Sequence, residues 1–201
     1  MKNIKKILLS IIVAFVAIWG SFYTENLTER QKREEMSKYN PEQLVKAIMK
    51  DSIGTLQEEA LSIKELAEGI ASGHEAFATK HGRTLGIGSP IFYVVKGECE
   101  NVRLVNDEEI QGVTEGITFT IPLKYIFGNT ARDASGWFNI DNFQNTMDFN
   151  AVSAAMNAYI GKEVKEFRLT PNQPIRFVCA TAIPADAQEI SSITLIPYLL
   201  K

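Results

Sequence analysis

The sequence predicts an α+β fold in which short helices precede a mainly β region. Two changes of pattern along the chain predict it. Between residues 40 and 82, apolar residues recur at the spacing of one helical face. From residue 90 onward, short runs of β-branched and aromatic residues alternate with Gly, Asn, Asp and Pro. The composition, 45% apolar and 22% charged, is that of a globular domain.

The first 23 residues predict a signal-anchor helix in the membrane. Three lysines within the first six residues precede an uncharged run over 7–23. As a helix this run is about 25 Å long, near the lower limit for a membrane span. Lysines ahead of an apolar run place the N-terminus in the cytoplasm and the rest of the chain outside it. Ile18-Trp19-Gly20 is a poor cleavage site, so an uncleaved anchor is favoured, and a cleaved signal stays open.

The chain beyond this run is acidic. The whole sequence carries 21 basic and 24 acidic residues. The three lysines of residues 1–23 face no acid there, so 24–201 has 18 basic and 24 acidic residues, a net charge of −6. A domain of this sign repels phosphate backbones. We therefore expect no nucleic-acid partner.

The sequence predicts a mixed-charge stalk over 24–39 and a single extracytoplasmic domain over 40–201. Asn40 and Pro41 form a helix start, with an N-cap residue followed by Pro at the first helical position. Capping-box patterns begin at Ser62 and at Ser72, and Gly82 ends the last helix. These signals predict two to four short helices over 40–82.

The region 90–201 is predicted to be mainly β. Its β-rich runs are 91–95, 101–105, 117–121, 175–180 and 193–196. One helix lies between the third and fourth runs, with Asn150 as its N-cap and Gly161 at its end. One helix before the last two strands is the order of a small antiparallel OB-like β-barrel. An open antiparallel sheet fits the same order, so both architectures stay open.

Cys99 and Cys179 are the only cysteines. In an OB-like barrel their strands are neighbours, and outside the cytoplasm two thiols can form a disulfide. Two buried free thiols are the open alternative, because only closely opposed pairs can be bridged. Neither cysteine has a second ligand at metal-binding spacing, so we expect no metal or cofactor. The two histidines, His74 and His81, are expected at the surface.

Residues 129–150 form the candidate site. They contain five Asn, three Asp and four aromatic residues and are expected to form a long loop. Amides and carboxylates beside aromatic rings are typical of sugar recognition. Turns, helix caps and a local ion pair could use the same residues, and this alternative stays open. The candidate ligand- or partner-binding residues are Asn129, Arg132, Asp133, Ser135, Trp137, Asn145, Asp148 and Asn150.

The same stretch resembles the bacterial domain-of-unknown-function family 2291. The resemblance depends on Phe127-Gly128-Asn129, 132–136, 145–150, Ser153 and Asn157. It implies a predicted periplasmic lipoprotein on the outer side of the cytoplasmic membrane, of a family often encoded beside sugar ATP-binding-cassette importers. A sugar importer or its substrate is therefore the expected partner. No Cys follows the apolar run, so the lipid-attachment signal is missing, and the family offers no catalytic residues to transfer.

Three functions fit these observations. The first is a non-enzymatic, membrane-anchored accessory protein that binds a sugar or an importer component. The second is a carboxylate-based glycoside hydrolase that uses two of Asp133, Asp141 and Asp148, which requires two carboxylates facing each other across a cleft. The third is an OB-like module for oligosaccharides or oligonucleotides, although the acidic charge opposes nucleic acid.

Overall fold

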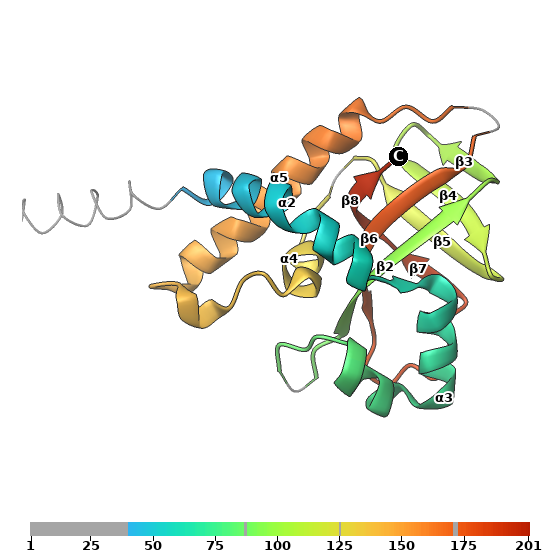
Figure 1. Ribbon diagram of the computed structural model, residues 1–201, viewed down its shortest axis with the longest axis horizontal. Helices are drawn as coiled ribbons and strands as arrows, with labels where there is room; N and C mark the ends of the chain where they lie inside the picture. Colours follow the sequence, from blue (N-terminus) through green and yellow to red (C-terminus); the bar gives the residue numbers. More distant parts are fainter. Residues whose placement is uncertain (1–39, 87, 125, 171–172) are drawn as a thin grey trace, which may run out of the picture. The chain divides into compact units, whose positions relative to one another are not determined.

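The computed structural model describes residues 40–201, except 87, 125, 171 and 172. The predicted anchor (1–23) and stalk (24–39) lie outside the described residues. No helix in the described part of the chain has the length and hydropathy of a membrane span. Helices and two sheets make up this part, as the α+β prediction expected (Figure 1).

Two helices occupy the predicted helical region. Helix α2 (Pro41–Glu59) begins at the predicted proline, and α3 (Ile63–His81) begins after Ser62. Ser62 and Glu65 form the predicted capping box, in which the backbone N of Ser62 donates to Glu65 Oε2 at 2.7 Å. The second predicted capping box, at Ser72, does not form, because Ser72 Oγ donates to the Glu68 carbonyl, although two helical segments do meet next to it. Instead α3 kinks at Gly73, whose φ of 144° is open only to glycine without strain.

The strands form two four-stranded sheets. Sheet A has the order β1-β2-β6-β8, and sheet B has the order β3-β4-β5-β7. The β1–β2 and β5–β7 pairs are parallel, and the other pairs are antiparallel. The strands of sheet A are β1 (Leu61–Ser62), β2 (Ile91–Cys99), β6 (Ile175–Ile183) and β8 (Ile196–Leu200). Those of sheet B are β3 (Val102–Val105), β4 (Glu109–Thr114), β5 (Ile117–Pro122) and β7 (Ser192–Thr194).

Two short interruptions connect the sheets. Only residues 100–101 separate β2 from β3, and only Leu195 separates β7 from β8. If each pair is counted as one bent strand, the neighbours follow the OB-like order. The predicted OB-like order is thus confirmed, whereas the predicted antiparallel barrel is not closed, because the ladders break at these bends, and the β5–β7 pair is parallel. Strand β4 was not predicted, because Gly112 and polar side chains hide its β pattern.

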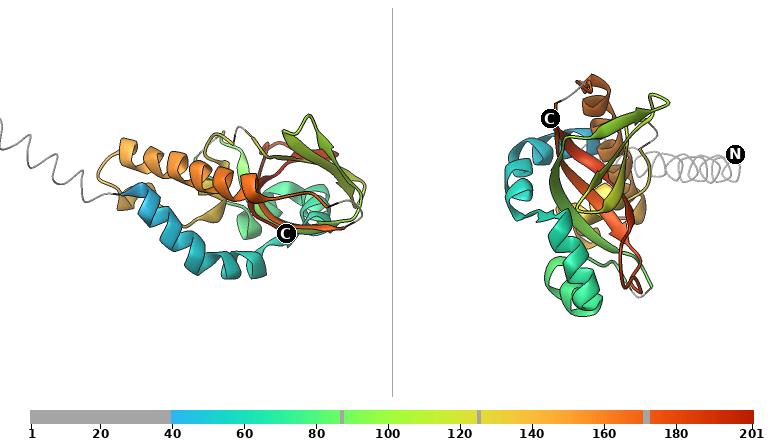
Figure 2. Two further views of the ribbon diagram at one scale, coloured as in Figure 1. Left: turned by 90° about the horizontal axis from the view of Figure 1, so that it is seen from above. Right: turned by 90° about the vertical axis from the view of Figure 1, so that its right-hand side faces the viewer.

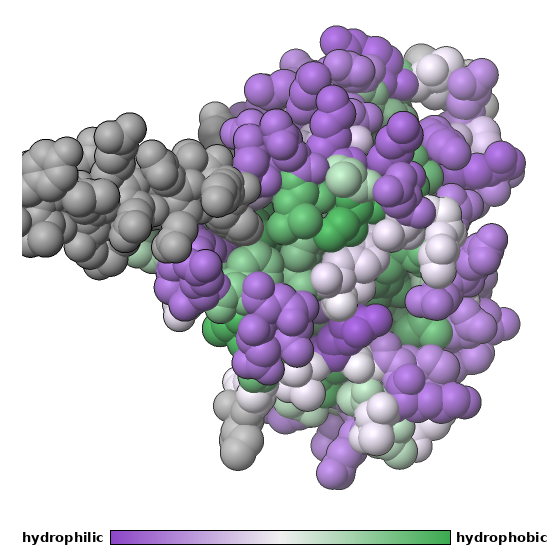
Figure 3. All heavy atoms as spheres, turned by 60° about the vertical axis from the view of Figure 1, so that its left-hand side comes forward, coloured by the Kyte–Doolittle hydropathy of each residue, from purple (hydrophilic) through white to green (hydrophobic). Residues whose placement is uncertain are grey.

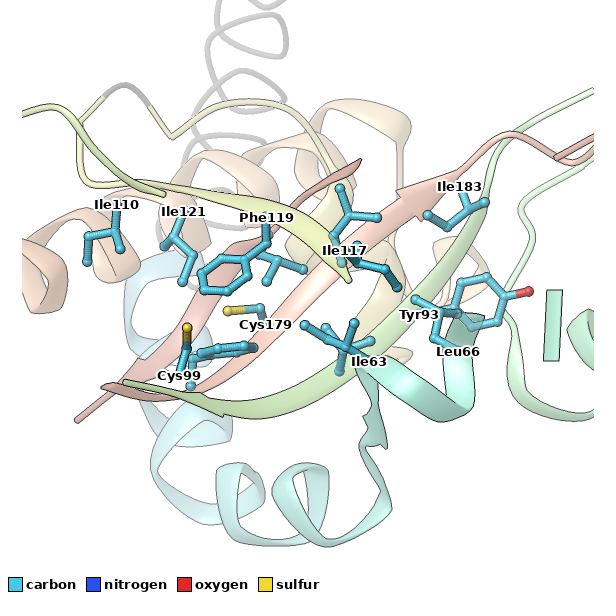
Figure 4. Close-up of a cluster of buried hydrophobic side chains, with 14 of the residues drawn as sticks. Ile63, Leu66, Tyr93, Cys99, Ile110, Ile117, Phe119, Ile121, Cys179 and Ile183 are labelled. Carbon is cyan, nitrogen blue, oxygen red and sulfur yellow. The ribbon is translucent and has the colours of Figure 1, made fainter. Parts of the chain in front are cut away.

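The main core lies between the sheets (Figure 4). The rings of Phe119 and Phe177 pack with centroids 5.2 Å apart. Each ring also covers a glycine, since a Cβ on Gly112 would lie 2.5 Å from Phe119 and one on Gly97 would lie 2.6 Å from Phe177. The two glycines therefore let aromatic rings lie flat against the strands. Helix α3 contributes further buried apolar side chains to this core.

The two cysteines lie on adjacent strands but do not form a disulfide. Strand β2 pairs with β6, which confirms the predicted adjacency. In that register Cys179 is opposite Val95, and Cys99 is opposite Ile175. An offset of four residues is about 13 Å along a strand, well beyond the ~7 Å limit for a bridge. The disulfide prediction was wrong, and both cysteines are buried free thiols that face the core (Figure 4).

Helices α2, α4 (Thr130–Ser135) and α5 (Thr146–Glu166) form a layer on sheet A (Figure 2). Helix α4 contacts β2, β6 and β8, and α2 packs along α5. The predicted limits of α5 were wrong at both ends. Asn145 caps it instead of Asn150, and the helix continues through Gly161 because Ile160 and Val164 on either side are buried. Residues 129–150 are therefore not a long loop but α4, a 3-10 turn (Ile140–Asn142) and the start of α5.

Candidate functional site

A buried ion pair lies at the centre of the candidate site. Arg132 and Asp133 on α4 are only 3% and 6% exposed. Arg132 Nε donates to Asp133 Oδ1 at 2.7 Å. Its Nη1 donates to the Phe149 carbonyl at 3.2 Å and lies 3.4 Å from Asn150 Oδ1. A buried charge needs such partners, and these partners connect α4 to the first turn of α5.

The other buried polar groups of α4 also bind protein atoms. Ser135 Oγ donates to the Arg132 carbonyl at 2.7 Å and accepts from the Trp137 backbone N at 3.3 Å. The hydroxyl of Tyr198 on β8 donates to the Ala131 carbonyl. Burial raises the pKa of Tyr198 well above its ordinary value, so the hydroxyl keeps the proton that it donates. These bonds hold α4 against sheet A.

Arg83 is part of this arrangement, although no sequence pattern marks it as a site residue. Gly136 ends α4 in the left-handed conformation, with φ 64°. A Cβ at this position would lie 2.1 Å from Nη1 of Arg83, so the guanidinium lies directly over the glycine. The only signal in the sequence was the glycine itself at the end of a polar run.

The remaining candidate residues lie nearer the surface. Asn129 and Asn150 are exposed, and Trp137 is half-buried with its ring centroid 5.9 Å from that of Tyr198. Asn145 caps α5, and its Nδ2 donates to Asp148 Oδ2 at 2.9 Å. Arg132, Asp133, Ser135 and Asn150 thus belong to one network, and Asn145 with Asp148 forms a separate cap. These contacts match the alternative of caps and a local ion pair, and ligand binding by these residues stays a prediction.

His74 is buried, contrary to the expectation of a surface residue. Its Nε2 lies 3.0 Å from the hydroxyl of Tyr93, and its Nδ1 has no hydrogen-bond partner. The kink at Gly73 turns the histidine toward β2, which the helical pattern did not reveal. His81 is exposed, as expected, with its ring against Phe77. Across the described residues, no group of three or more His, Cys, Asp and Glu side chains could hold a metal ion.

A groove of about 630 Å³ runs beside α5, and we call it the α5 groove. Phe127 lies on its wall with 70% of its surface exposed. Asn157 Nδ2 donates to the Gly128 carbonyl at 2.9 Å and so connects α5 to the segment that carries Phe127. The groove is lined by Leu123, Lys124, Ile126, Phe127, Gly128, Ala154, Asn157, Ala158, Gly161, Lys162 and Lys165.

Other apolar side chains are also exposed around the helical layer. Ile140 and Met147, at the turn before α5 and in its first turn, are both exposed. On the face in Figure 3, apolar surface gathers in one area that polar side chains surround. Exposed apolar surface bordered by polar residues is typical of interaction sites. The exposed apolar surface is therefore a better candidate for an interaction site than the buried polar network around Arg132.

The strand order and the helical layer define the protein as an OB-fold domain with added helices. An OB-fold protein from Thermotoga maritima is similar in its crystal structure, with a TM-score of 0.67 and 18% sequence identity. The match covers 81% of this chain and 98% of that one, and it establishes the fold alone. The chain belongs to the family described as predicted periplasmic lipoprotein (DUF2291), whose model matches residues 12–201. No curated protein matches the chain.

Proposed function

We propose that this protein is a non-enzymatic accessory module of the cell envelope. Residues 1–23 anchor it in the membrane, and the domain 40–201 binds a partner protein on the extracytoplasmic side. The family description supports the extracytoplasmic place of the domain. The expected partner is a component of a sugar importer, which follows from the family resemblance.

The α5 groove is the observation that carries this proposal. Two parts of the sequence signature, Phe127-Gly128 and Asn157, meet in its wall through a hydrogen bond. This contact fixes the residue that directly follows Phe127, whose side chain is largely exposed. A Phe ring is less stable in water than in an apolar environment, and aromatic side chains are enriched in protein interfaces. The signature thus supports a binding surface as well as the buried network around Arg132.

An enzymatic function receives less support. Of the three acids considered for glycoside hydrolysis, Asp133 is buried and paired with Arg132. Asp148 accepts from the Asn145 side chain, and Asp141 lies exposed in the 3-10 turn. The described residues that line the α5 groove include no carboxylate. A hydrolase needs one carboxyl as acid and another as base or nucleophile, facing the same bond.

Nucleic-acid binding also receives little support. OB-fold proteins bind oligonucleotides on one face of the barrel, with aromatic rings that stack on bases and a basic groove. On the four strands of sheet B, the only aromatic residue is the buried Phe119 and the only basic residue is Arg103. Arg103 already donates to Gln111 Oε1 at 2.6 Å. A protein partner is therefore the better match.

Photo-cross-linking in the native membrane tests the proposal. The full chain would carry p-benzoyl-phenylalanine in place of Phe127, and a control chain would carry it in place of Val113, an exposed apolar residue on β4. We expect an envelope protein, identified as an importer component by mass spectrometry, to be cross-linked from position 127 and not from 113. Equal labelling from both positions would contradict a partner site at the groove.

A separate experiment tests whether the domain binds a free sugar. Isothermal titration calorimetry of the full chain in detergent, against a panel of monosaccharides, measures sugar binding directly. Saturable binding to one sugar would favour a sugar ligand over a protein partner. The proposal of a protein partner expects no heat of binding across the panel.

A further inference from the structure

The floor of the α5 groove is suited to a helix. Ala154, Ala158 and Gly161 follow one another at helical spacing and all line the groove. Because their side chains are small, the axis of a second helix can approach α5 closely. The exposed ring of Phe127 stands beside this floor on the other wall. The shape is therefore a concave channel along a helix with one bulky apolar contact.

Charge is separated around the groove. Lys124, Lys162 and Lys165 line it, and no acid is present among its described lining residues. Glu163, on the same turn of α5, instead lines a hollow beside β8. The chain outside the predicted anchor is acidic overall, with a net charge of −6. The groove is thus a local basic site on an acidic protein, and its field attracts negative charge.

We propose that the α5 groove binds an acidic amphipathic helix of the partner protein. The apolar face of that helix packs on Ala154, Ala158 and Phe127, and its carboxylates pair with the three lysines. Helix-in-groove recognition of this kind combines apolar anchors at helical spacing with charged flanks. This inference rests on the proposed function, because it names the chemistry of the partner at the same site.

Two other occupants match the groove less well. A second copy of the chain, placed groove to groove, would bring both sets of lysines together, and like charges across an interface are unfavourable. A flat bilayer surface would leave a concave channel of about 630 Å³ unfilled. Anionic lipid is nevertheless attracted by lysines, so the experiment includes an outcome for it.

The experiment places p-benzoyl-phenylalanine at Lys124, an exposed lining residue outside the small-residue floor, in the full chain in its native membrane. Cross-linked peptides are mapped by mass spectrometry in four backgrounds. These are the otherwise unchanged chain, Lys162→Glu with Lys165→Glu, Lys162→Arg with Lys165→Arg, and Lys46→Glu with Lys50→Glu. The last pair is a matched control, because Lys46 and Lys50 are exposed on α2 and do not line the groove. Circular dichroism confirms that each variant keeps its fold.

We expect the cross-link to map to a partner segment with carboxylates on one helical face. Reversal of Lys162 and Lys165 should lower its yield at least tenfold, since like charges across an interface cost more than about 1.4 kcal/mol, which is tenfold in affinity. The arginine pair and the α2 control should keep the yield. A partner cross-link that ignores the reversal would overturn the acidic helix and leave the proposed function standing. Cross-links to lipid would assign the groove to the membrane, and silence at both 124 and 127 would remove both proposals.

Discussion

The guanidinium carbon of Arg132 lies 3.7 Å from the centroid of the Phe149 ring, and the same guanidinium donates to the Phe149 carbonyl. Arg132 on α4 therefore contacts both the ring and the backbone carbonyl of Phe149, in the first turn of α5. Cations over aromatic faces attract, and the attraction grows when water is excluded. Asp133 neutralises the charge from the other side. This contact joins α4 to the first turn of α5, and both lie in the stretch 129–150 that was predicted to be one long loop.

Replacing Arg132 with Met should destabilise the domain strongly. The change leaves the Asp133 carboxylate buried without its partner, which costs about 3–5 kcal/mol. Urea denaturation of residues 41–201, which form their own compact unit, measures this loss. The double variant Arg132→Met with Asp133→Leu is the control and should recover much of the stability, because no charge then stays buried. If the single variant loses less than about 1 kcal/mol of unfolding free energy, Arg132 and Asp133 do not form a buried ion pair.

Replacing Gly136 with Ala should destabilise the domain for two separable reasons. The residue has φ 64°, which costs a non-glycine residue about 1–2 kcal/mol. The new Cβ would also meet the Arg83 guanidinium. In the background Arg83→Ala, the same change should cost only the backbone strain, and the double-mutant cycle gives the difference. Purely additive effects would contradict the contact between Arg83 and Gly136.

Both cysteines should stay unreactive in the folded protein. Cys99 and Cys179 are buried, and burial raises the pKa of the Cys179 thiol well above its ordinary value. Since the thiolate is the reactive form, iodoacetamide should label neither cysteine in buffer and both in urea, as mass spectrometry would show. Labelling of no cysteine in urea without reductant would mean that the bridge forms after all.

The order of strands was predictable because it depends on local patterns. Runs of Val, Ile and Phe located β2, β5 and β6, and the OB-like order then placed β2 beside β6. The β pattern did not reveal β4, because Gly112 occupies one of its inward positions. That glycine is needed only because the Phe119 ring on the neighbouring strand covers it. The division of the predicted barrel into two sheets was not predictable for a similar reason. Breaks in the ladders depend on bends that no single residue type marks.

The candidate site was harder to predict than the fold. Asx-rich sequence looks the same whether it caps helices or binds a ligand, and only tertiary contacts separate the two. Arg132 and Asp133 are adjacent in sequence, so their ion pair was foreseeable, but the contact with Phe149 depends on how α4 meets α5. Arg83 lies more than fifty residues from Gly136 in the chain. The burial of His74 required the kink at Gly73.

The stability of the domain should fall in alkaline solution, partly through Tyr93. Burial raises its pKa from 10.0 to about 12 in the folded protein. Between these values the folded state keeps a proton that the unfolded state has lost, so rising pH favours unfolding. The contribution is fully present below pH 10 and is lost toward pH 12. Urea denaturation over this range should show a shallower pH dependence for Tyr93→Phe, and an unchanged slope would contradict the raised pKa.

Phe127 should matter for binding and not for stability. Because 70% of its surface is exposed, Phe127→Ala should change the unfolding free energy by less than about 0.5 kcal/mol. Phe177→Ala is the contrasting control, since Phe177 is 2% exposed in the core and its loss should cost about 3–5 kcal/mol. Urea denaturation compares the two variants. The cross-link from position 124 should then weaken severalfold in Phe127→Ala, because the partner loses its aromatic contact on the groove wall. If the cross-link keeps its full yield, Phe127 does not anchor the partner, and the groove would have to bind it through the lysines and the helix floor alone.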